Sequence, residues 1–271
     1  MPELPEVETI VRDLARLAVG ATIREVEVIR PDVVEGEDAA SFATVLRGCT
    51  IDGVSRRAKN IVLALGEVRL VVNLGMTGRL LVAGVGEPEP SHVAVRMPLH
   101  DGRTLLYHDV RRFGRLRRFS ESGWVARASE MGPEPLDPEW TPERLLDGAG
   151  RSRVAVKSWL MDQRRVVGVG NIYASEALFR AGIDPRRPAQ SLVPDEAAGL
   201  HAAIRDVLRE AIEFRGTTLL DYRDAAGERG GFAERLQVYG RVGEPCRRCA
   251  APLVRIVQGG RSTFLCGNCQ R

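Results

Sequence analysis

The sequence predicts an α+β protein in which an N-terminal helix is followed by a β-sandwich or barrel, and then by a helical domain that ends in a two-stranded ribbon. Short β-rich runs with Gly, Asp and Asn between them fill residues 22–119, and helical patterns follow a proline-rich stretch at 131–140. A chain of 271 residues with 44% hydrophobic content is expected to form two domains. We place the boundaries at 1–130, 131–145 (a linker), 146–235 (the helical domain) and 236–271 (the ribbon).

The N-terminal helix is expected over residues 5–19. Proline fits its first turn, glycine can end it, and apolar residues recur at helical spacing: Val7, Ile10, Val11, Leu14 and Leu17. Glu3 and Glu6 lie at the helix start, where the helix dipole stabilises carboxylates. Removal of the initiator methionine would expose the secondary amine of Pro2. Because a free α-amine has a pKa of about 7.7 to 8.0, a useful fraction would be nucleophilic at neutral pH. A short leader before an ordinary helix is the alternative.

Basic residues are unevenly distributed. Residues 103–118 carry six arginines against one aspartate, and 229–271 carry eight arginines against two glutamates. These segments could form one phosphate-facing surface, and a solvated basic face is the alternative. All 39 basic residues except Lys59 and Lys157 are arginine. Lysine is a compact charge with three donors and an easily shifted pKa, so these two are candidates for phosphate contact or proton transfer.

Four of the five cysteines form two CxxC pairs near the C-terminus: Cys246, Cys249, Cys266 and Cys269. This spacing predicts a structural site for one zinc ion, with four thiolates and no position left for catalytic water. The residues between the pairs alternate as two strands around "QGG", which places Arg261 at the tip of the ribbon. The fifth cysteine, Cys49, is expected to be small, buried and without chemistry.

The helical domain favours a nucleic-acid partner. Helices are expected within "TPERLLDGAG", "RVAVKSWLMDQ", "IYASEALFRAG" and "DEAAGLHAAIRDVLREAIEF", and Asn171 is expected to cap the third of these. Backbone N–H groups at that helix start can bind phosphate. No stretch approaches the roughly 18 apolar residues of a membrane span, and the first 20 residues are too acidic for a signal peptide. A cytoplasmic protein is therefore expected.

Several motifs occur in register along the chain: "PELPEVET", "NLGMTGRL", "DVRRFG", "MGPEPL", "VGVGNIYASEALF", "LQVYGR" and the CxxC pairs. In these motifs the chain resembles the formamidopyrimidine-DNA glycosylases, which are bacterial base-excision enzymes. The resemblance implies an N-terminal β-sandwich with its helix, and a helix-two-turn-helix domain ending in a zinc ribbon. It also implies removal of oxidised purines, chiefly 8-oxoguanine paired with cytosine and ring-opened formamidopyrimidines, from double-stranded DNA. Strand cleavage is expected to follow base removal. We also expect the protein to act as a monomer and to use no nucleotide cofactor.

The resemblance assigns catalytic roles to Pro2, Glu3, Glu6 and Lys59. Pro2 would attack C1′ of the damaged nucleotide and form a Schiff base, and Glu3 would act as general acid and base near the sugar. Glu6 would help to position the N-terminus. Lys59 would contact phosphate on the lesion side, and Lys157 matches the family's lysine beside the lesion-flanking backbone.

A further set is implied to bind DNA. Met76 and Phe113 would replace the stacking that is lost when the base leaves the duplex, and Arg111 would hydrogen-bond the orphaned cytosine. The remaining members resemble a phosphate clamp: His92, Arg112, Asn171, Tyr239 and Arg261. Glu176 resembles a helix carboxylate near the lesion pocket, and a purely structural role is its alternative.

Two departures from the family pattern bear on loop geometry. The family often has proline where Val110 stands, and an aromatic or apolar residue where Asn60 follows the hairpin lysine. The segment 217–231 resembles a lesion-capping loop that varies among relatives. One alternative function is that of an endonuclease VIII-like enzyme for oxidised pyrimidines. Leu4 disfavours it, and so do the residues that would fill the space left by the base: Met76, Arg111 and Phe113. A catalytically silent damage-binding paralogue is the other, which the catalytic residues disfavour.

Overall fold

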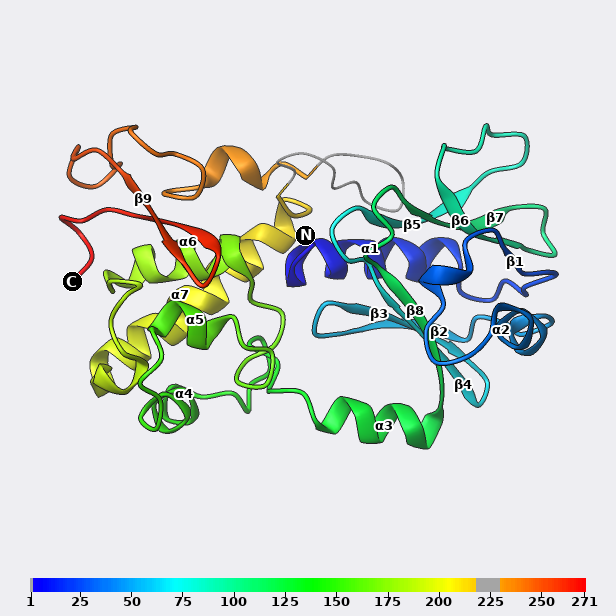
Figure 1. Cartoon of the computed structure of the whole chain (residues 1–271), viewed down its shortest axis with the longest axis horizontal. Coiled ribbons are helices and arrows are strands. Elements are labelled where there is room, and N and C mark those ends of the chain that lie inside the picture. The colour runs from blue at the N-terminus through cyan, green and yellow to red at the C-terminus, as the bar shows by residue number, and fades with distance from the viewer. Residues whose placement is uncertain (1, 218–229) are drawn as a thin grey trace. The chain divides into compact units, whose positions relative to one another are not determined.

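The computed structural model of the chain describes residues 2–217 and 230–271. They divide into two compact units (Figure 1). Unit 1 comprises Met1–Ser129 and Phe214–Gly231, and unit 2 comprises Glu130–Glu213 and Phe232–Arg271. None of the helices in the described ranges is long and apolar enough to cross a membrane.

The first helix of unit 1, α1 (Leu4–Leu17), confirms the predicted N-terminal helix. Glu3 is its N-cap, and Glu6 closes a capping box with Glu3 at the helix start. Its apolar stripe is buried, whereas Leu17 in the last turn is 36% exposed. The helix packs on strands of both sheets of the unit, so the N-terminal residues are carried by a well-supported element.

Two antiparallel sheets form the predicted β-sandwich of unit 1. One has the order β1–β6–β7–β5, with bounds Glu27–Val28, Val93–Pro98, Thr104–Asp109 and Gly78–Ala83. The other has the order β2–β3–β4–β8, with bounds Gly53–Arg57, Asn60–Leu65, Val68–Asn73 and Arg115–Ser120. Apolar residues of both sheets join α1 and α2 (Ala39–Leu46) in one buried core, including Leu63, Val95, Met97 and Leu105. Two short helices, η1 (Pro31–Val33) and α3 (Glu121–Ser129), are the remaining described elements of unit 1.

Unit 2 is helical and ends in the predicted ribbon. Its helices are α4 (Pro142–Ala149), α5 (Val156–Leu160), α6 (Asn171–Ala181), η2 (Ala189–Ser191), α7 (Pro194–Glu213) and η3 (Phe232–Arg235). α6 packs on α5 and α7, and α7 also packs on α4. The antiparallel strands β9 (Val254–Gln258) and β10 (Arg261–Leu265) form the ribbon, and β10 packs on α6. A small core of Phe179, Val238, Leu253 and Phe264 joins the ribbon to the helices.

A buried histidine in unit 1 leads to a prediction about pH. His108 on β7 is 5% exposed, and burial, Arg79 and His92 lower its pKa, while Asp109 acts in the opposite direction. Folding therefore favours the neutral ring, and the unfolded chain takes up this proton at a higher pH than the folded chain. The stability of unit 1 should fall as the pH drops below 6.5, by at most about 1.4 kcal/mol per pH unit from this group.

Urea unfolding between pH 5 and pH 7.5 measures the slope, and the His108→Gln variant should lose most of it. His100→Gln is the matched control, because His100 is exposed in the same unit. An unchanged slope in the His108→Gln variant would show that His108 does not cause the pH dependence.

Candidate functional site

The residues at the start of α1 are buried and held by one carboxylate. Pro2 is buried, Glu3 is 3% exposed and Glu6 is 2% exposed. Oε2 of Glu6 accepts the N–H of Glu3 at 2.7 Å, and Oε1 accepts the N–H of Thr217 at 2.7 Å. Glu6 therefore fixes the peptide group next to Pro2 and also the end of the segment that follows α7. These contacts support a positioning role for Glu6.

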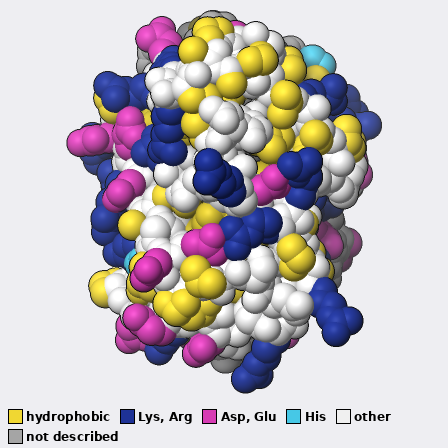
Figure 2. All heavy atoms as spheres, turned by 90° about the vertical axis from the view of Figure 1, so that its left-hand side faces the viewer, with side chains coloured by type: hydrophobic (Ala, Val, Ile, Leu, Met, Phe, Trp, Pro, Cys, Tyr) yellow, Lys and Arg dark blue, Asp and Glu magenta, His cyan; other side chains and the backbone are white. Residues whose placement is uncertain are grey.

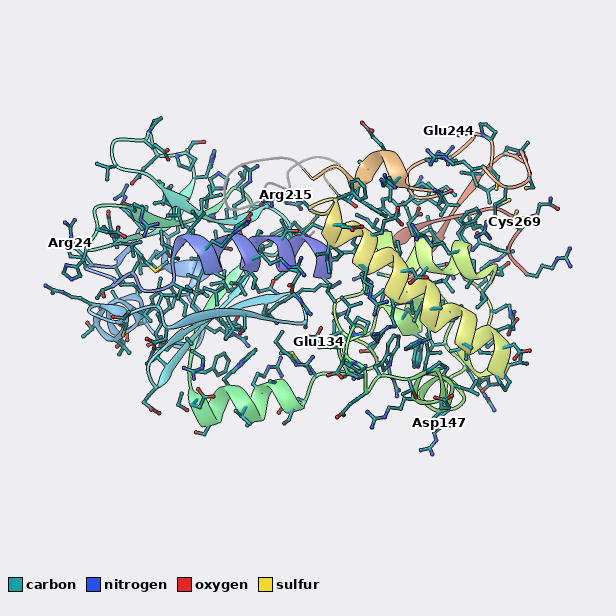
Figure 3. The ribbon with its side chains drawn as sticks, turned by 180° about the vertical axis from the view of Figure 1, so that it is seen from behind. Arg24, Glu134, Asp147, Arg215, Glu244 and Cys269 are labelled. Atoms are coloured by element: carbon teal, nitrogen blue, oxygen red, sulfur yellow. The ribbon has the colours of Figure 1, made fainter. Side chains whose placement is uncertain are left out.

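A second carboxylate of α1 holds the same segment. Asp13 is 4% exposed and accepts from Arg215 and from Arg16, each at 2.6 Å; Arg215 is labelled in Figure 3. Gly216 has φ +82°, and a Cβ at this position would lie 2.8 Å from Oε1 of Glu6. Only glycine suits both requirements. The residues that lead into the predicted lesion-capping loop are thus fixed to α1, while residues 218–229 of that loop lie outside the described residues, as does Met1.

Lys59 lies in the two-residue turn between β2 and β3, where Arg57 pairs with Asn60. Arg56, whose side chain is 10% exposed, donates to the carbonyl of Ala58 at 2.9 Å and to Oε2 of Glu8 at 3.0 Å. Arg56 therefore ties the turn to α1. Sequence reasoning missed this pair because Glu8 and Arg56 are 48 residues apart and neither lies in a local charge pattern that points to the other.

Three residues, Met76, Arg111 and Phe113, are expected to fill the space that the extruded base leaves in the duplex. The structure brings two of them together. The guanidinium of Arg111 lies 4.6 Å from the ring centroid of Phe113, and Phe113 is 53% exposed. Met76 is 43% exposed. Its neighbour Gly75 has φ +56°, and a Cβ there would lie 2.5 Å from the backbone nitrogen of Gly114. The two loops are therefore in close contact, and they present uncovered apolar side chains of the kind that mark interaction surfaces.

Asp109 organises both of these loops, and no sequence pattern singled it out. It is 1% exposed, and its Oδ1 accepts from Thr77 Oγ1 at 2.5 Å and from the Arg111 N–H at 3.2 Å. Its Oδ2 accepts from the Gly114 N–H at 2.9 Å and from the Tyr107 hydroxyl at 3.2 Å. Burial, with the Asp109 charge, raises the pKa of Tyr107, which keeps that hydroxyl as a donor.

Two expected phosphate contacts of unit 1 have unusual backbones. His92 has φ +66° and Arg112 has φ +53°, and both side chains are exposed. Left-handed backbone is uncommon outside glycine and often occurs at functional sites. Arg112 Nε lies 3.5 Å from Oδ2 of Asp32.

The arginine-rich segment 103–118 does not act as one basic block. Arg117 pairs with Glu35, Arg118 pairs with Glu37 at 2.8 Å, and Arg103 pairs with Asp101 at 2.5 Å. Acidic side chains of the same unit therefore neutralise part of this segment, and its place in a phosphate-facing surface stays a prediction.

Lys157 is buried in unit 2 and holds three polar groups of that unit. It is 1% exposed, and its Nζ donates to Asn171 Oδ1 at 2.7 Å, to Thr263 Oγ1 at 2.7 Å and to the Ser262 carbonyl at 3.1 Å. An ammonium has three N–H donors, so these contacts use its donors inside unit 2. Lys157 therefore joins α5 to α6 and β10, and the expected contact with the DNA backbone stays a prediction.

Asn171 does not cap α6, contrary to the prediction from the sequence. Gly170 is the N-cap residue, and Asn171 is the first helical residue. Its Nδ2 donates to the Tyr239 hydroxyl at 3.2 Å and to the Ser262 carbonyl at 3.0 Å. The structure thus brings Lys157, Asn171 and Tyr239 together in one polar cluster beside β10.

The structural alternative for Glu176 is the one that its contacts support. Glu176 is fully buried and accepts the N–H groups of Gln237, Val238 and Tyr239 at 2.8, 2.9 and 2.9 Å. Burial raises its pKa, while the three N–H donors act in the opposite direction. The carboxylate holds the segment that carries Tyr239.

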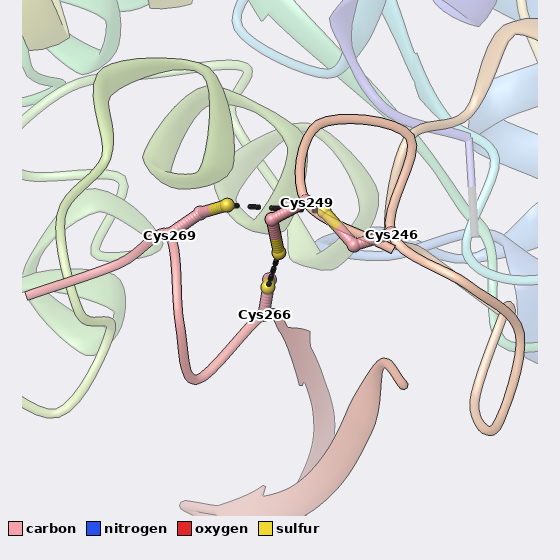
Figure 4. Close-up of side chains that lie close together, drawn as sticks. All are labelled: Cys246, Cys249, Cys266 and Cys269. Atoms are coloured by element: carbon pink, nitrogen blue, oxygen red, sulfur yellow. Dashed lines mark hydrogen bonds between the residues drawn. The ribbon is translucent and has the colours of Figure 1, made fainter. Parts of the chain in front are cut away.

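The four predicted zinc ligands converge at the base of the ribbon (Figure 4). Their sulfur atoms all lie within 4.8 Å of one another, with 3.9 Å between Cys246 and Cys269 and 3.5 Å between Cys249 and Cys266. A tetrahedral ion with Zn–S bonds of about 2.3 Å places its sulfur ligands about 3.8 Å apart, so the site fits zinc. Gly259 and Gly260 form the turn at the far end of the ribbon, next to the exposed Arg261.

The arginines of unit 2 are also partly engaged within the chain. Arg235 pairs with Glu210 at 3.2 Å, Arg241 pairs with Glu244 at 2.8 Å, and Arg248 lies over the ring of Phe179 at 4.5 Å. On the face that Figure 2 shows, basic side chains are spread among acidic and apolar ones. Position rather than total charge therefore distinguishes Arg261 at the ribbon tip.

A β-sandwich with a helix-start proline and a helical unit with a zinc ribbon define a class of zinc-ribbon DNA-binding proteins. Family descriptions match along the chain: the formamidopyrimidine-DNA glycosylase N-terminal domain at residues 1–116, its H2TH (helix-two-turn-helix) domain at 131–222, and the zinc finger found in FPG and IleRS at 243–271. The chain belongs to the formamidopyrimidine-DNA glycosylase family.

Relatives and solved structures resemble the chain over its length. A formamidopyrimidine-DNA glycosylase of Symbiobacterium thermophilum is 43% identical over 100% of this chain and 89% of its own, and one of Moorella thermoacetica is 46% identical over 94% of each. The crystal structure of MutM (Fpg) from Thermus thermophilus has a TM-score of 0.88 and 43% identity, covering 99% of this chain and 98% of that one. Lactococcus lactis Fpg in complex with abasic-site DNA has a TM-score of 0.92 and 33% identity, covering 99% of each chain.

Removal of zinc should unfold the ribbon and abolish duplex DNA binding, because four thiolates without a metal leave its base unsupported. Metal analysis should find one zinc per chain, and Cys246→Ser should lose both the metal and DNA binding in a gel-shift assay. Cys49→Ser is the control, because Cys49 lies outside the cluster in unit 1. Metal-free protein that binds duplex DNA normally would contradict this role.

Lys157→Met should destabilise unit 2, because Asn171 Oδ1 and Thr263 Oγ1 lose this donor at about 1–3 kcal/mol each, while the Ser262 carbonyl keeps the Asn171 amide. DNA affinity should fall without a change in its salt dependence, since Lys157 Nζ contacts protein groups. Arg261→Gln is the matched comparison: loss of one phosphate contact should lower the log–log salt slope by about 0.9. A similar drop in the salt slope for Lys157→Met would show that Lys157 contacts phosphate directly.

Proposed function

We propose that this chain removes oxidised purines from duplex DNA through its N-terminal proline and then cuts the strand at the abasic site. The observation that carries the proposal is the start of α1, where buried Glu3 and Glu6 flank the N-terminal peptide in a chain of the formamidopyrimidine-DNA glycosylase family. The substrates proposed are 8-oxoguanine paired with cytosine and formamidopyrimidine lesions.

Base removal begins at the Pro2 amine once Met1 has been removed. The nitrogen lone pair forms a bond to C1′ while the glycosidic bond breaks. The base leaves with the electrons of the glycosidic bond and takes up the proton that the Pro2 ammonium gives up. Opening of the sugar ring then breaks the C1′–O4′ bond, and Glu3 delivers the proton that O4′ needs. The product is an iminium, or Schiff base, between Pro2 and the open sugar.

Strand cleavage follows from this iminium. It acidifies the C2′ proton, whose loss expels the 3′-phosphate in β-elimination, and a second proton loss at C4′ expels the 5′-phosphate in δ-elimination. Glu3 accepts and returns protons in these steps, and Lys59 offers a compact cation to the departing phosphate. Hydrolysis of the iminium releases Pro2. Zinc takes no part in these steps, because four cysteines fill its coordination.

The loops that carry Met76 and Arg111 serve base extrusion. Removing a base from the stack costs a few kcal/mol, and a side chain inserted in its place compensates for part of that cost. Met76 and Phe113 are exposed and apolar, as this role requires, and Arg111 can hydrogen-bond the unpaired cytosine. His92, Arg112 and Arg261 are exposed and suit phosphate contacts, while Asn171 and Tyr239 support β10 beside Arg261.

We further propose that the enzyme acts as a monomer in the bacterial cytoplasm, associated with the nucleoid through DNA, and that it uses no nucleotide cofactor. A single N-terminal amine is sufficient for the steps above.

Borohydride trapping tests the mechanism. Protein whose first residue is verified as proline should form a covalent adduct on 8-oxoguanine and abasic-site duplexes, and peptide mapping should locate it on the Pro2 amine. Glu3→Gln should lose excision of 8-oxoguanine by about 100-fold or more, because a general acid or base contributes that much. A thymine-glycol duplex is the comparison substrate: faster excision from it than from the 8-oxoguanine duplex would indicate a pyrimidine-specific enzyme instead. Absence of an adduct from verified protein would refute the lyase, and would favour a silent damage-binding protein.

A further inference from the structure

Two asparagine side chains connect the turn of Lys59 with the loop of Met76. Asn60 and Asn73 face each other at the paired ends of β3 and β4. Asn73 Nδ2 donates to Asn60 Oδ1 at 3.0 Å, and Asn60 Nδ2 donates to the Arg57 carbonyl at 3.2 Å. Asn73 Oδ1 accepts the Gly75 N–H at 3.0 Å. Three hydrogen bonds thus link the two backbones in series.

The backbone at both ends fixes the direction of this series. The Gly75 N–H can only donate, so Asn73 must present its oxygen to it and its nitrogen to Asn60. Asn60 must then present its oxygen to Asn73 and its nitrogen to the Arg57 carbonyl, which can only accept. An amide is the side chain that meets both demands at both positions, because aspartate lacks the donor and leucine lacks both groups.

At one end the series holds a strained turn. Ala58 has φ +57°, in a region that alanine rarely adopts, and it is 4% exposed. The Arg57 carbonyl held by Asn60 directly precedes Ala58, and Arg56 holds the Ala58 carbonyl at 2.9 Å. Ala58 is therefore fixed on both sides, and with it the backbone that leads into Lys59.

At the other end the series holds the residue before Met76. The Cα of Gly75 faces the backbone of Phe113 and Gly114 so closely that a Cβ would lie 2.6 Å from Phe113 C. Thr77, on the other side of Met76, donates to Asp109 at 2.5 Å and accepts the Arg111 N–H at 3.0 Å. A displacement of Gly75 would therefore be transmitted to both void-filling loops.

We propose that Asn60 and Asn73 are positioning residues that couple the Lys59 turn to the Met76 loop, so that base extrusion and strand cleavage depend on one shared backbone arrangement. This inference rests on the function proposed above for Lys59 and Met76.

The experiment measures the two steps separately in Asn60→Ala, Asn73→Ala and the double variant. Single-turnover excision of 8-oxoguanine reports base extrusion, and β-elimination at a preformed abasic site reports the Lys59 step. Asn73→Ala, at the Met76 end, should slow β-elimination as well as excision, and Asn60→Ala, at the Lys59 end, should slow excision as well as β-elimination, each by roughly 10-fold. The double variant should show the loss of one single variant rather than the product of two, because the bonds act in series.

Thr22→Val is the matched control. Thr22 and Thr50 are also bridged residues of unit 1 whose side chains share a hydrogen bond of 2.9 Å, and they take part in no step above. If the asparagines only stabilise the sheet, their variants will match Thr22→Val, with a lower Tm and unchanged rates of folded protein, and the coupling is refuted. Multiplicative losses in the double variant would also refute it. A wild-type protein without either activity would refute the proposed function itself, and the coupling with it.

Discussion

Buried carboxylates that accept backbone N–H groups hold the functional segments of both units. Glu6 fixes the peptide beside Pro2, Asp109 fixes the loop of Arg111, and Glu176 fixes the segment of Tyr239. Hydrogen bonds to a charged acceptor are short and strong, and a buried N–H that loses its acceptor is costly. Each of these segments consequently has one backbone arrangement before any DNA arrives, and the side chains that it carries are placed in advance.

The chain's two lysines also lie in segments that hydrogen bonds hold in place. Lys157 sits where three acceptors converge within about 3 Å, which suits a compact ammonium and would not admit a planar guanidinium. Lys59 stands on a turn whose flanking residues, Arg56 and Asn60, supply the hydrogen bonds that fix it. In a chain where nearly every other basic residue is arginine, lysine marks places where size and donor geometry matter more than charge alone.

The sequence predicts well what depends on neighbouring residues. The zinc site follows from two CxxC pairs, and α1 follows from its apolar spacing and its start at Pro5, so both are confirmed. It predicts poorly what depends on partners brought together by folding. Asn171 is of a residue type that often caps helices, yet Gly170 is the N-cap residue of α6. The side-chain amide of Asn171 is hydrogen-bonded to Lys157 and Tyr239 instead. Asp109 lies in a recognisable motif, and three of its four donors are near it in the chain, but folding brings in the fourth, Thr77, and buries the carboxylate.

The ribbon illustrates how these constraints combine. Cys266 directly follows β10, while Lys157 and Asn171 hold the carbonyl of Ser262 at the start of the same strand. The strand is therefore fixed at both ends, by metal ligation at one and by a buried polar cluster at the other. Arg261 precedes Ser262, so the exposed guanidinium stands next to the fixed point rather than at the end of a free hairpin. A side chain anchored in this way loses less freedom when it meets a phosphate, and this is the physical reason to expect that the loss of Lys157 weakens DNA binding.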